Sequence, residues 1–276
     1  MLPVRKAFYV RIILLSLSVA LFGFLAGCTT VVQSDKRVDT TRSIRIAPNT
    51  TVSALGAVNM HVPLLVDHVD LFPSGFMIRT AESIVYIDPL VVDSAVPADY
   101  ILITHDHADH LSLPDIKRIH QERTVIVGPP IVAKKLENYT VKEIKPGERI
   151  KLGDIQCEAV PAYNTNALFL GIRAHRKSEH HVGYIITTDG ARIYHAGDTD
   201  FIPEMKEISN ITLALLPIAG AKLTMSTEEA ASFVNRFRPK MVVPMHYQMG
   251  TDEPEKFMRL VEEPTKVVLM DRPAPK

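Results

Sequence analysis

Three histidines and an aspartate stand within six residues of the chain, in the segment 104–110, which reads THDHADH. Imidazole and carboxylate groups are the ligands that zinc and its first-row neighbours prefer, and a hydrophobic core has no use for such a cluster. Alternate side chains of an extended segment point the same way, so His105 and His107 can hold one ion. Asp109 and His110 follow a turn of the chain and can hold a second ion nearby. The segment therefore predicts a metal site, and paired ions are a known hydrolytic arrangement.

Two residues far along the chain could complete this site. Asp198 follows Gly197, which allows a tight turn after a strand, although an aspartate in a turn can also simply bind its own backbone. His246 follows a short apolar run, where a capping or partly buried histidine is the alternative interpretation. If these strand ends share one edge of a sheet, the side chains converge on the histidine cluster. We therefore predict that Asp198 bridges the two ions and that His246 binds the second.

The elements that must position these residues are short β-like runs alternating with helix-like patterns. The clearest helix is predicted at 226–237, where Ser226 and Glu229 form a capping box ahead of an apolar face. The strand 83–87 runs into Asp88, which we expect to orient a ligand. Bunched strands with helices between them indicate a layered sandwich of sheets and helices. Strands are predicted at 75–80, 83–88, 100–104, 124–127, 155–160, 182–188, 191–195, 212–217, 241–244 and 266–271, and helices at 113–121, 130–138, 226–237 and 253–262.

In order and spacing, the segments 104–110, 196–200 and 244–247 resemble the metallo-β-lactamase superfamily; they read THDHADH, AGDTD and PMHY. The segments 160–164 (VPAYN) and 182–186 (VGYII) are similar to one branch, that of L-ascorbate-6-phosphate lactonase-like hydrolases and, more distantly, the N-acyl-phosphatidylethanolamine phospholipase D type. The longer run 193–205, which contains AGDTD, is also similar to this branch. The resemblance implies an α+β fold, a four-layer αββα sandwich, with a two-metal site at one edge and a metal-bound hydroxide as the nucleophile.

One ligand of the superfamily has no direct counterpart here. A metal-binding histidine usually stands on the strand before the Gly-Asp-Thr motif, but the expected segment 162–165 reads AYNT. In the branch named above a histidine occurs further on, before Gly-Tyr, and His175 occupies that place. We expect His175 to bind the first metal, with Asn164 as the alternative ligand or as a group that orients one. Without either residue, the first ion would keep two histidines and Asp198.

The resemblance implies a metal-dependent hydrolase that acts on an ester, lactone or phosphodiester, either a small molecule or a lipid. Zinc is the first choice for both divalent ions, with manganese or iron as alternatives. Asp109 and Asp198 are the residues that we expect to take part in catalysis. The alternative is a non-catalytic metal-binding or assembly lipoprotein, which the incomplete histidine pattern would permit.

The first 28 residues resemble a bacterial lipoprotein signal. Three basic residues precede an apolar run over 12–25, and the run ends at LAGC, whose last residue is Cys28. Cleavage before Cys28 would remove the signal peptide 1–27 and leave a lipid-modified N-terminus, with an uncleaved signal anchor as the alternative. The resemblance implies a membrane-anchored protein of the bacterial cell envelope. Thr29 favours the outer membrane, facing the periplasm, over the inner membrane.

Residues 28–56 are rich in polar residues with little periodicity, so we predict a lipid-anchored tether ahead of a hydrolase domain at 57–276. The chain has 31 basic and 31 acidic residues and no basic run, which argues against a nucleic-acid partner. Cys157 has no partner for an intramolecular disulfide, and we expect it buried on a strand.

The remaining polar candidates receive plainer interpretations. His180 and His181 follow a polar segment and are expected in a solvated loop at the rim. His195 is expected to pack at a strand end beside the ligands, and Asp200 to be a turn residue or to orient a ligand. Ordinary, partly exposed positions are expected for His61, His68 and His120.

Overall fold

The computed structural model describes residues 30–33, 43–62, 66–92, 96–168 and 172–272. The predicted signal 1–27 and Cys28 lie outside the described residues. Among the residues that are described, no helix is long and apolar enough to span a bilayer.

The first of two large sheets carries the histidine cluster. Its strands are β2 (Ser43–Ala47), β3 (Thr50–Ala54), β6 (Phe76–Arg79), β7 (Ile84–Ile87), β8 (Tyr100–Leu102), β9 (Val125–Gly128) and β10 (Val141–Glu143). They lie in the order β10-β9-β8-β7-β6-β3-β2, and β7, β8 and β9 run parallel. Parallel strands that are covered on both faces need near-continuous apolar sequence, which β8 and β9 supply.

The second large sheet carries the other predicted ligands. Its strands are β11 (Arg149–Leu152), β12 (Ile155–Pro161), β13 (Val182–Thr188), β14 (Ala191–His195), β15 (Leu213–Pro217), β16 (Met241–Met245) and β18 (Lys266–Val267). They follow one another in chain order across the sheet, and β14, β15 and β16 are parallel. The predicted hairpin between β13 and β14 is present. Asp189 and Gly190 have φ of 49° and 72°, as a tight two-residue turn requires.

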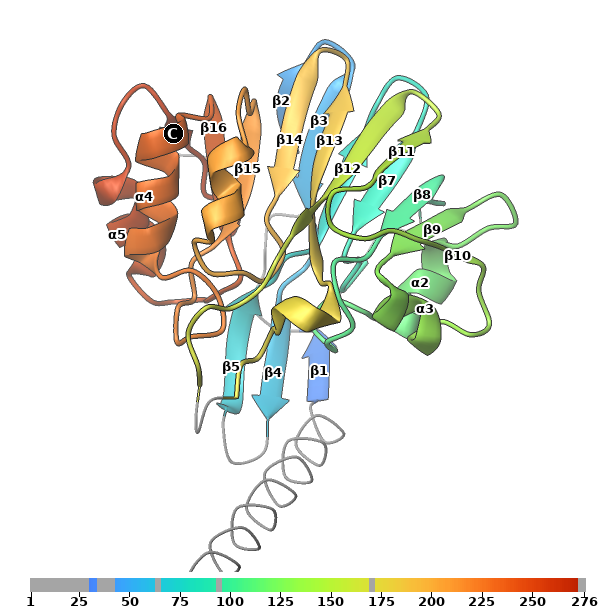
Figure 1. Ribbon diagram of the computed structural model, residues 1–276, viewed down its shortest axis with the longest axis horizontal. Helices are drawn as coiled ribbons and strands as arrows, with labels where there is room; N and C mark the ends of the chain where they lie inside the picture. Colours follow the sequence, from blue (N-terminus) through green and yellow to red (C-terminus); the bar gives the residue numbers. More distant parts are fainter. Residues whose placement is uncertain (1–29, 34–42, 63–65, 93–95, 169–171, 273–276) are drawn as a thin grey trace, which may run out of the picture.

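Helices cover the outer faces of both sheets (Figure 1). They are α2 (Leu113–Ile119), α3 (Pro130–Lys135), α4 (Thr227–Phe237) and α5 (Glu253–Leu260). Ile116 of α2 and Val132 of α3 are buried against the first sheet, and Phe233 of α4 and Phe257 of α5 against the second. The predicted capping box of α4 is formed by Ser226 and Glu229. The four-layer αββα sandwich expected from the sequence is therefore confirmed.

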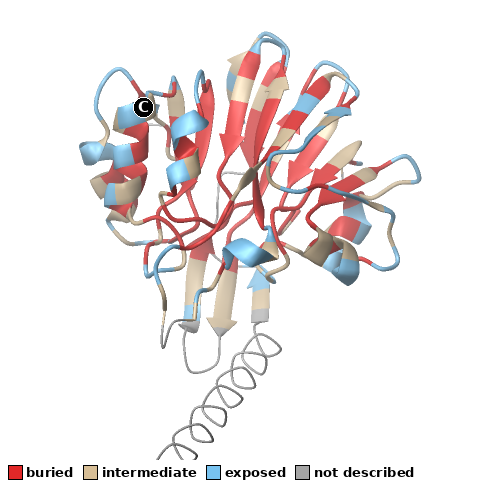
Figure 2. Cartoon of the chain, viewed as in Figure 1, coloured by how far each residue is buried: buried red, intermediate tan, exposed pale blue. Residues whose placement is uncertain are grey.

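The main core lies between the two sheets, where buried residues dominate (Figure 2). Phe76 and Ile78 from the first sheet belong to the same cluster as Tyr184 and Ile193 from the second, and each of these four side chains is fully buried. Burying large apolar side chains from both sheets is the main stabilising contribution, at about 25 cal/mol for each Å² removed from water. This core holds the strand ends rigidly beside one another.

A third, smaller sheet projects from one end of the sandwich (Figure 1). Its strands are β1 (Thr30–Gln33), β4 (Val58–Val62), β5 (Val66–Phe72) and β17 (Tyr247–Gln248), in the order β1-β4-β5-β17.

The folded body begins earlier than the predicted boundary at residue 57. Strands β2 and β3 are part of the first large sheet, and Val52 and Ala54 are buried in the main core. Polar residues dilute the apolar signal of β2 and β3 in the sequence. Thr nonetheless suits a strand, since its β-branched side chain packs well on a pleated surface.

Candidate metal centre

The ends of four strands meet at one edge of the sandwich and carry the predicted site residues. β7 leads into Asp88, β8 towards His105, β14 towards Asp198 and β16 into His246. Since β7 and β8 are parallel, and β14 and β16 are parallel through β15, the carboxyl ends within each set lie at the same edge. Asp88 and His246 have φ of 44° and 50°, a left-handed conformation that costs free energy in residues with a Cβ and recurs at functional sites.

Gly197 allows the turn that presents Asp198. Its φ is 63°, and a Cβ at this position would lie 2.9 Å from the backbone oxygen of Val182. Only glycine adopts this backbone without strain and without that contact. The chain can therefore leave β14 sharply and direct the next side chain between the two sheets.

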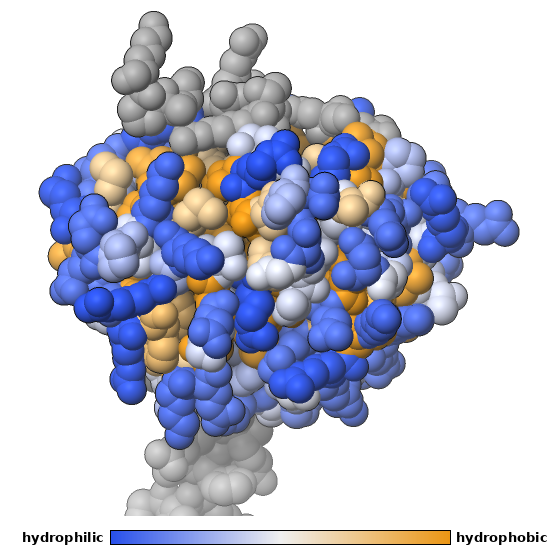
Figure 3. All heavy atoms as spheres, turned by 90° about the horizontal axis from the view of Figure 1, so that it is seen from above, coloured by the Kyte–Doolittle hydropathy of each residue, from blue (hydrophilic) through white to orange (hydrophobic). Residues whose placement is uncertain are grey.

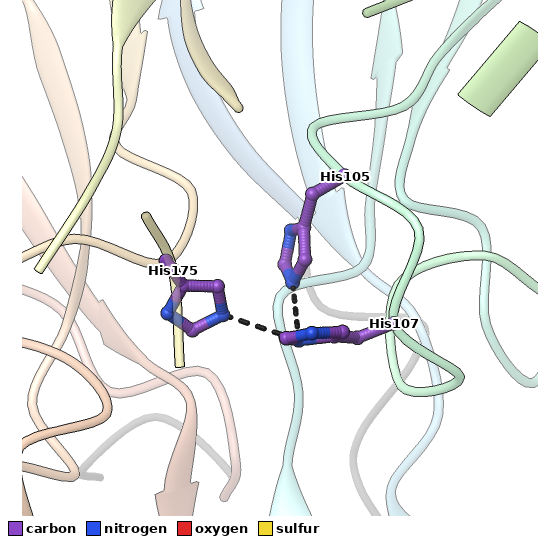
Figure 4. A group of neighbouring side chains, drawn as sticks. All are labelled: His105, His107 and His175. Carbon is purple, nitrogen blue, oxygen red and sulfur yellow. Dashed lines mark hydrogen bonds between the residues drawn. The ribbon is translucent and has the colours of Figure 1, made fainter. Parts of the chain in front are cut away.

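His105, His107 and His175 form the first group of potential ligands (Figure 4). Nε2 of His105 and Nε2 of His175 each lie 3.1 Å from Nδ1 of His107. The nitrogens of a tetrahedral zinc site, about 2.0–2.1 Å from the ion, lie about 3.4 Å apart. The three ring nitrogens therefore surround a position that one ion could fill. His175, the residue expected in place of the usual histidine, is the one that completes the group.

Asp109, His110, Asp198 and His246 form the second group, with one ligand atom of each within 4.8 Å of the others. The Asp198 carboxylate reaches both groups. Its Oδ1 lies 3.3 Å from Nε2 of His110, and its Oδ2 lies 3.1 Å from Nε2 of His246 and 3.6 Å from Nε2 of His175. This position between the groups is the one that a bridging carboxylate needs.

Asp88 orients His110 and does not belong to either group. Its Oδ2 accepts hydrogen bonds from Nδ1 of His110 at 2.8 Å and from Oγ1 of Thr104 at 2.6 Å. Its Oδ1 accepts a bond of 2.8 Å from the backbone N–H of Thr104. With Nδ1 of His110 used in this way, Nε2 is left to face the second group, as in the carboxylate–histidine–metal arrangements of metalloenzymes.

Asn164 plays the corresponding part for His175. Its Oδ1 lies 2.9 Å from Nδ1 of His175 and accepts a 3.0 Å bond from the backbone N–H of the same residue. The amide of Asn164 donates in turn to Oδ1 of Asp200 at 2.9 Å. Asn164 therefore stands behind His175 and outside the ligand group. Of the two alternatives for this residue, the structure favours the orienting role.

The buried polar atoms of the site fit a pair of divalent ions. Nε2 of His110 and Oδ1 of Asp198 are buried and lie 3.3 Å apart, and neither makes a hydrogen bond of good geometry. An unpaired buried polar atom costs about 1–3 kcal/mol, and a cation between the two atoms would remove that cost. Nitrogen and carboxylate donors in this combination suit zinc, manganese or iron. The two clusters together are consistent with a binuclear metal site.

Burial and mutual proximity determine the charge of these groups. Burial lowers the pKa of His105 and His175 well below the usual range, and neighbouring histidines lower it further, so both imidazoles are neutral, the form that binds metal. Burial raises the pKa of Asp198, but His246 and His110 outweigh it and hold that pKa well below its usual range. Burial also lowers the pKa of His246, but the adjacent Asp198 raises it to about 10. A cation would displace this proton.

His181 departs from its predicted place in a solvated loop, because it is 3% exposed. Its ring centroid lies 5.1 Å from that of His105, and its backbone oxygen accepts a bond from Ala162. β13 begins at the next residue, and its pairing with β12 draws His181 into the interior beside the site. His180 is exposed, as predicted.

The other histidines and Cys157 lie where they were expected. His195 is buried at the end of β14, where Nε2 donates to the backbone oxygen of Ser74 at 2.8 Å and Nδ1 accepts from Gly197 at 3.2 Å. It thereby stabilises the turn before Asp198. Cys157 is buried on β12. Half-buried or exposed positions are found for His61, His68 and His120.

The comparisons with known proteins identify the family. Residues 68–247 match the family model of the beta-lactamase superfamily domain. The chain belongs to the metallo-β-lactamase superfamily. A UPF0173 metal-dependent hydrolase from Pyrococcus furiosus is 35% identical over 221 residues, covering 71% of this chain and 92% of that protein. The chain is therefore a metal-dependent hydrolase of the UPF0173 family.

Solved structures agree with this assignment. A candidate metal-dependent hydrolase from Parabacteroides distasonis superposes with a TM-score of 0.64 at 30% identity, covering 79% of this chain and 95% of that chain. The metallo-β-lactamase fold protein YhfI from Bacillus subtilis has a TM-score of 0.60 at 11% identity, covering 81% of this chain and 98% of its own. At that identity the second likeness shows the fold alone.

Replacing Asn164 with alanine is expected to weaken metal binding at the first group by about 10- to 100-fold, the usual effect of removing a partner that orients a metal-binding histidine. His175 would lose its acceptor and rotate more freely. Titration with zinc against a competing chelator measures the effect. Asn138→Ala, at an exposed position after α3, is the matched control. Equal affinities for the two variants would contradict the orienting role.

Proposed function

We propose that this hydrolase cleaves an ester, lactone or phosphodiester bond with water that is activated at a pair of zinc ions. Manganese and iron are the alternative metals. The observation that carries the proposal is the place of Asp198, whose Oδ2 lies 3.6 Å from Nε2 of His175 in one group and 3.1 Å from Nε2 of His246 in the other. One carboxylate within reach of both groups is what a two-metal hydrolytic site requires.

Each residue of the site has a proposed role. When bound, a metal pair supplies Lewis-acid chemistry, which activates water near neutral pH and stabilises developing negative charge. His105, His107 and His175 would hold the first ion, and Asp109, His110 and His246 the second, with Asp198 shared between them.

Asp109 and Asp198 are the proposed catalytic carboxylates, in different positions. The side chain of Asp109 is 15% exposed, whereas that of Asp198 is 4% exposed. Asp198 therefore lies inside the protein, where its carboxylate would fix the positions of the two groups relative to each other. Asp109 lies nearer the solvent, where its carboxylate can accept a hydrogen bond from the attacking water.

A cavity of about 320 Å³ beside the first group is the proposed substrate pocket. It is lined partly by His181, whose ring lies next to that of His105, and by Tyr163, Lys177 and Glu204. Lys177 is paired with Glu204 at 2.6 Å, and Tyr163 donates to Glu204 at 2.9 Å. Because the positive charge of Lys177 is already neutralised, this lining favours an uncharged ester or lactone over a phosphodiester. The volume suits a small molecule or one end of a longer one.

The test is elemental metal analysis followed by a substrate panel. We expect about two transition-metal ions per chain, as a binuclear site requires, and turnover of lactones or carboxylic esters before phosphodiesters. Zero or one ion after exposure to zinc and manganese would contradict the binuclear proposal. Turnover of phosphodiesters alone would contradict the substrate preference and leave the metal site intact.

We also propose that the protein is a lipoprotein of the bacterial cell envelope, anchored through Cys28. The support is the sequence alone: the basic start, the apolar run and the LAGC segment. Outer-membrane placement facing the periplasm rests on Thr29. Mass spectrometry of the mature N-terminus tests the anchor, since Cys28→Ala should abolish both lipid attachment and cleavage. An unmodified Cys28 in the wild-type protein would contradict it.

A further inference from the structure

An apolar patch lies on β1 and the segments beside it. Among the described residues, four large apolar side chains are exposed, and two of them, Val32 (52%) and Leu113 (49%), belong to this region. Val32 lines a shallow cavity of about 210 Å³, and Leu113 stands between two other residues of its lining, Ser112 and Pro114. Most of the remaining lining is also apolar, namely Val31, Leu90, Val91 and Val92.

The polar groups of this region are occupied within the protein. The carboxylate of Asp115 accepts hydrogen bonds from the backbone N–H groups of Val91 and Val92, at 3.2 and 2.9 Å. Nη1 of Arg118 donates to the backbone oxygen of Val92 at 3.0 Å. These bonds hold the segment 90–92 against α2, and the surface between this segment and β1 combines apolar side chains with polar groups. Exposed basic residues, Lys117 and Arg118, stand on the same helix.

The patch shares its end of the molecule with the metal centre. Leu90 follows Asp88, which orients His110, by two residues, and Leu113 follows His110 by three. Figure 1 shows β1 projecting at the end opposite the β13–β14 hairpin. The opposite face, seen in Figure 3, is covered mostly by hydrophilic side chains with apolar residues scattered between them.

The proposed lipid attachment of Cys28 identifies what could cover the patch. β1 starts at Thr30, only two residues after Cys28. Two residues span at most about 7 Å, so an acyl chain on Cys28 would enter the bilayer next to β1. Val31 and Val32 would then lie at the lipid surface, and Lys117 and Arg118 could meet anionic headgroups.

We infer that the patch formed by Val31, Val32, Val91 and Leu113 docks on a lipid bilayer, with the metal centre facing the membrane surface. The inference rests on the proposed lipid attachment of Cys28 and on no particular substrate. Apolar faces of interfacial proteins enter the boundary between headgroups and acyl chains by about 5–10 Å. A site held in this way would meet esters dissolved in the membrane more readily than it would meet esters that diffuse freely in water.

The experiment uses the full chain, extracted from bacterial membranes and reconstituted into phosphatidylethanolamine–phosphatidylglycerol vesicles. Val32→Cys, Leu113→Cys and Met258→Cys variants are labelled with a polarity-sensitive fluorophore. Met258 is the matched control, because its side chain is 46% exposed. It stands on α5, the helix that covers the outer face of the second sheet. The thiol of Cys157 is buried, and that of Cys28 carries the lipid, so each variant offers a single reactive thiol.

Brominated lipid is then added to the vesicles. We expect loss of fluorescence for the labels at positions 32 and 113 and none for the label at 258. Equal quenching at all three positions, or none at 32 and 113, would overturn the docking surface. So would a wild-type chain that does not remain with the vesicles. Since the readout is fluorescence, an inactive chain can satisfy it and an active hydrolase can fail it, which separates this proposal from that of the substrate.

Discussion

Replacing Asp198 with asparagine should lower kcat/KM by about a thousandfold, since a shared carboxylate contributes several kcal/mol to a two-metal site and each 1.36 kcal/mol is a factor of ten. The amide keeps the size of the side chain but removes the negative charge that faces His110, His175 and His246. The two positive ions would then lie close together with less negative charge between them to offset their repulsion. We therefore also expect the bound metal to fall from about two ions per chain to one or fewer.

Kinetics on the substrate found in the panel and elemental analysis of the same preparation measure the two effects. Asp189→Asn is the matched control, because Asp189 stands in the exposed turn between β13 and β14 and its carboxylate accepts one bond from the backbone of Asn49. That variant should keep its metal and its rate. An Asp198→Asn protein with two ions and wild-type kcat/KM would refute the bridging role.

Removing the metal should abolish activity and lower the melting temperature by roughly 10 °C, because a ligand present at a thousand times its dissociation constant stabilises the folded state by about 4 kcal/mol. The structural reason is the first group, where Nδ1 of His107 lies 3.1 Å from Nε2 of both His105 and His175 in a largely buried site. Without an ion, the three imidazoles lose the cation that would hold them together. Asp198 and Asp109 likewise lose the cations that compensate their charge.

Thermal unfolding with and without a chelator measures the stability change, and zinc, manganese and iron(II) are then restored one at a time. The physiological metal should recover both the melting temperature and the rate. The Asp198→Asn variant should show a smaller shift on chelation, since it holds less metal to begin with. A melting temperature that does not respond to chelation would show that the site contributes nothing to folding and would weaken the assignment of the ligands.

Much of this architecture was predictable from local sequence. The predicted strands 182–188 and 191–195 coincide with β13 and β14, and the predicted helices begin within one residue of α2, α3, α4 and α5. Their signals are short-range: β-branched runs, a turn sequence and a capping box. The local sequence does not mark β2 and β3, because β2 is stabilised by pairing with β3, and β3 by pairing with β6, which lies more than 20 residues further along the chain.

The sequence by itself determined the chemistry of this protein, because four potential ligands lie within six residues and Asp198 and His246 follow recognisable strands. Only the tertiary structure decided how the first group is completed. His175 and Asn164 were both candidates for the missing ligand. Which of the two faces the ion depends on the hydrogen bond between them, and they stand eleven positions apart in the chain. The burial of His181 and the closeness of β1 to α2 were likewise decided by packing. Spacing along a chain predicts which residues can bind a metal, but the direction of each side chain depends on contacts between distant segments.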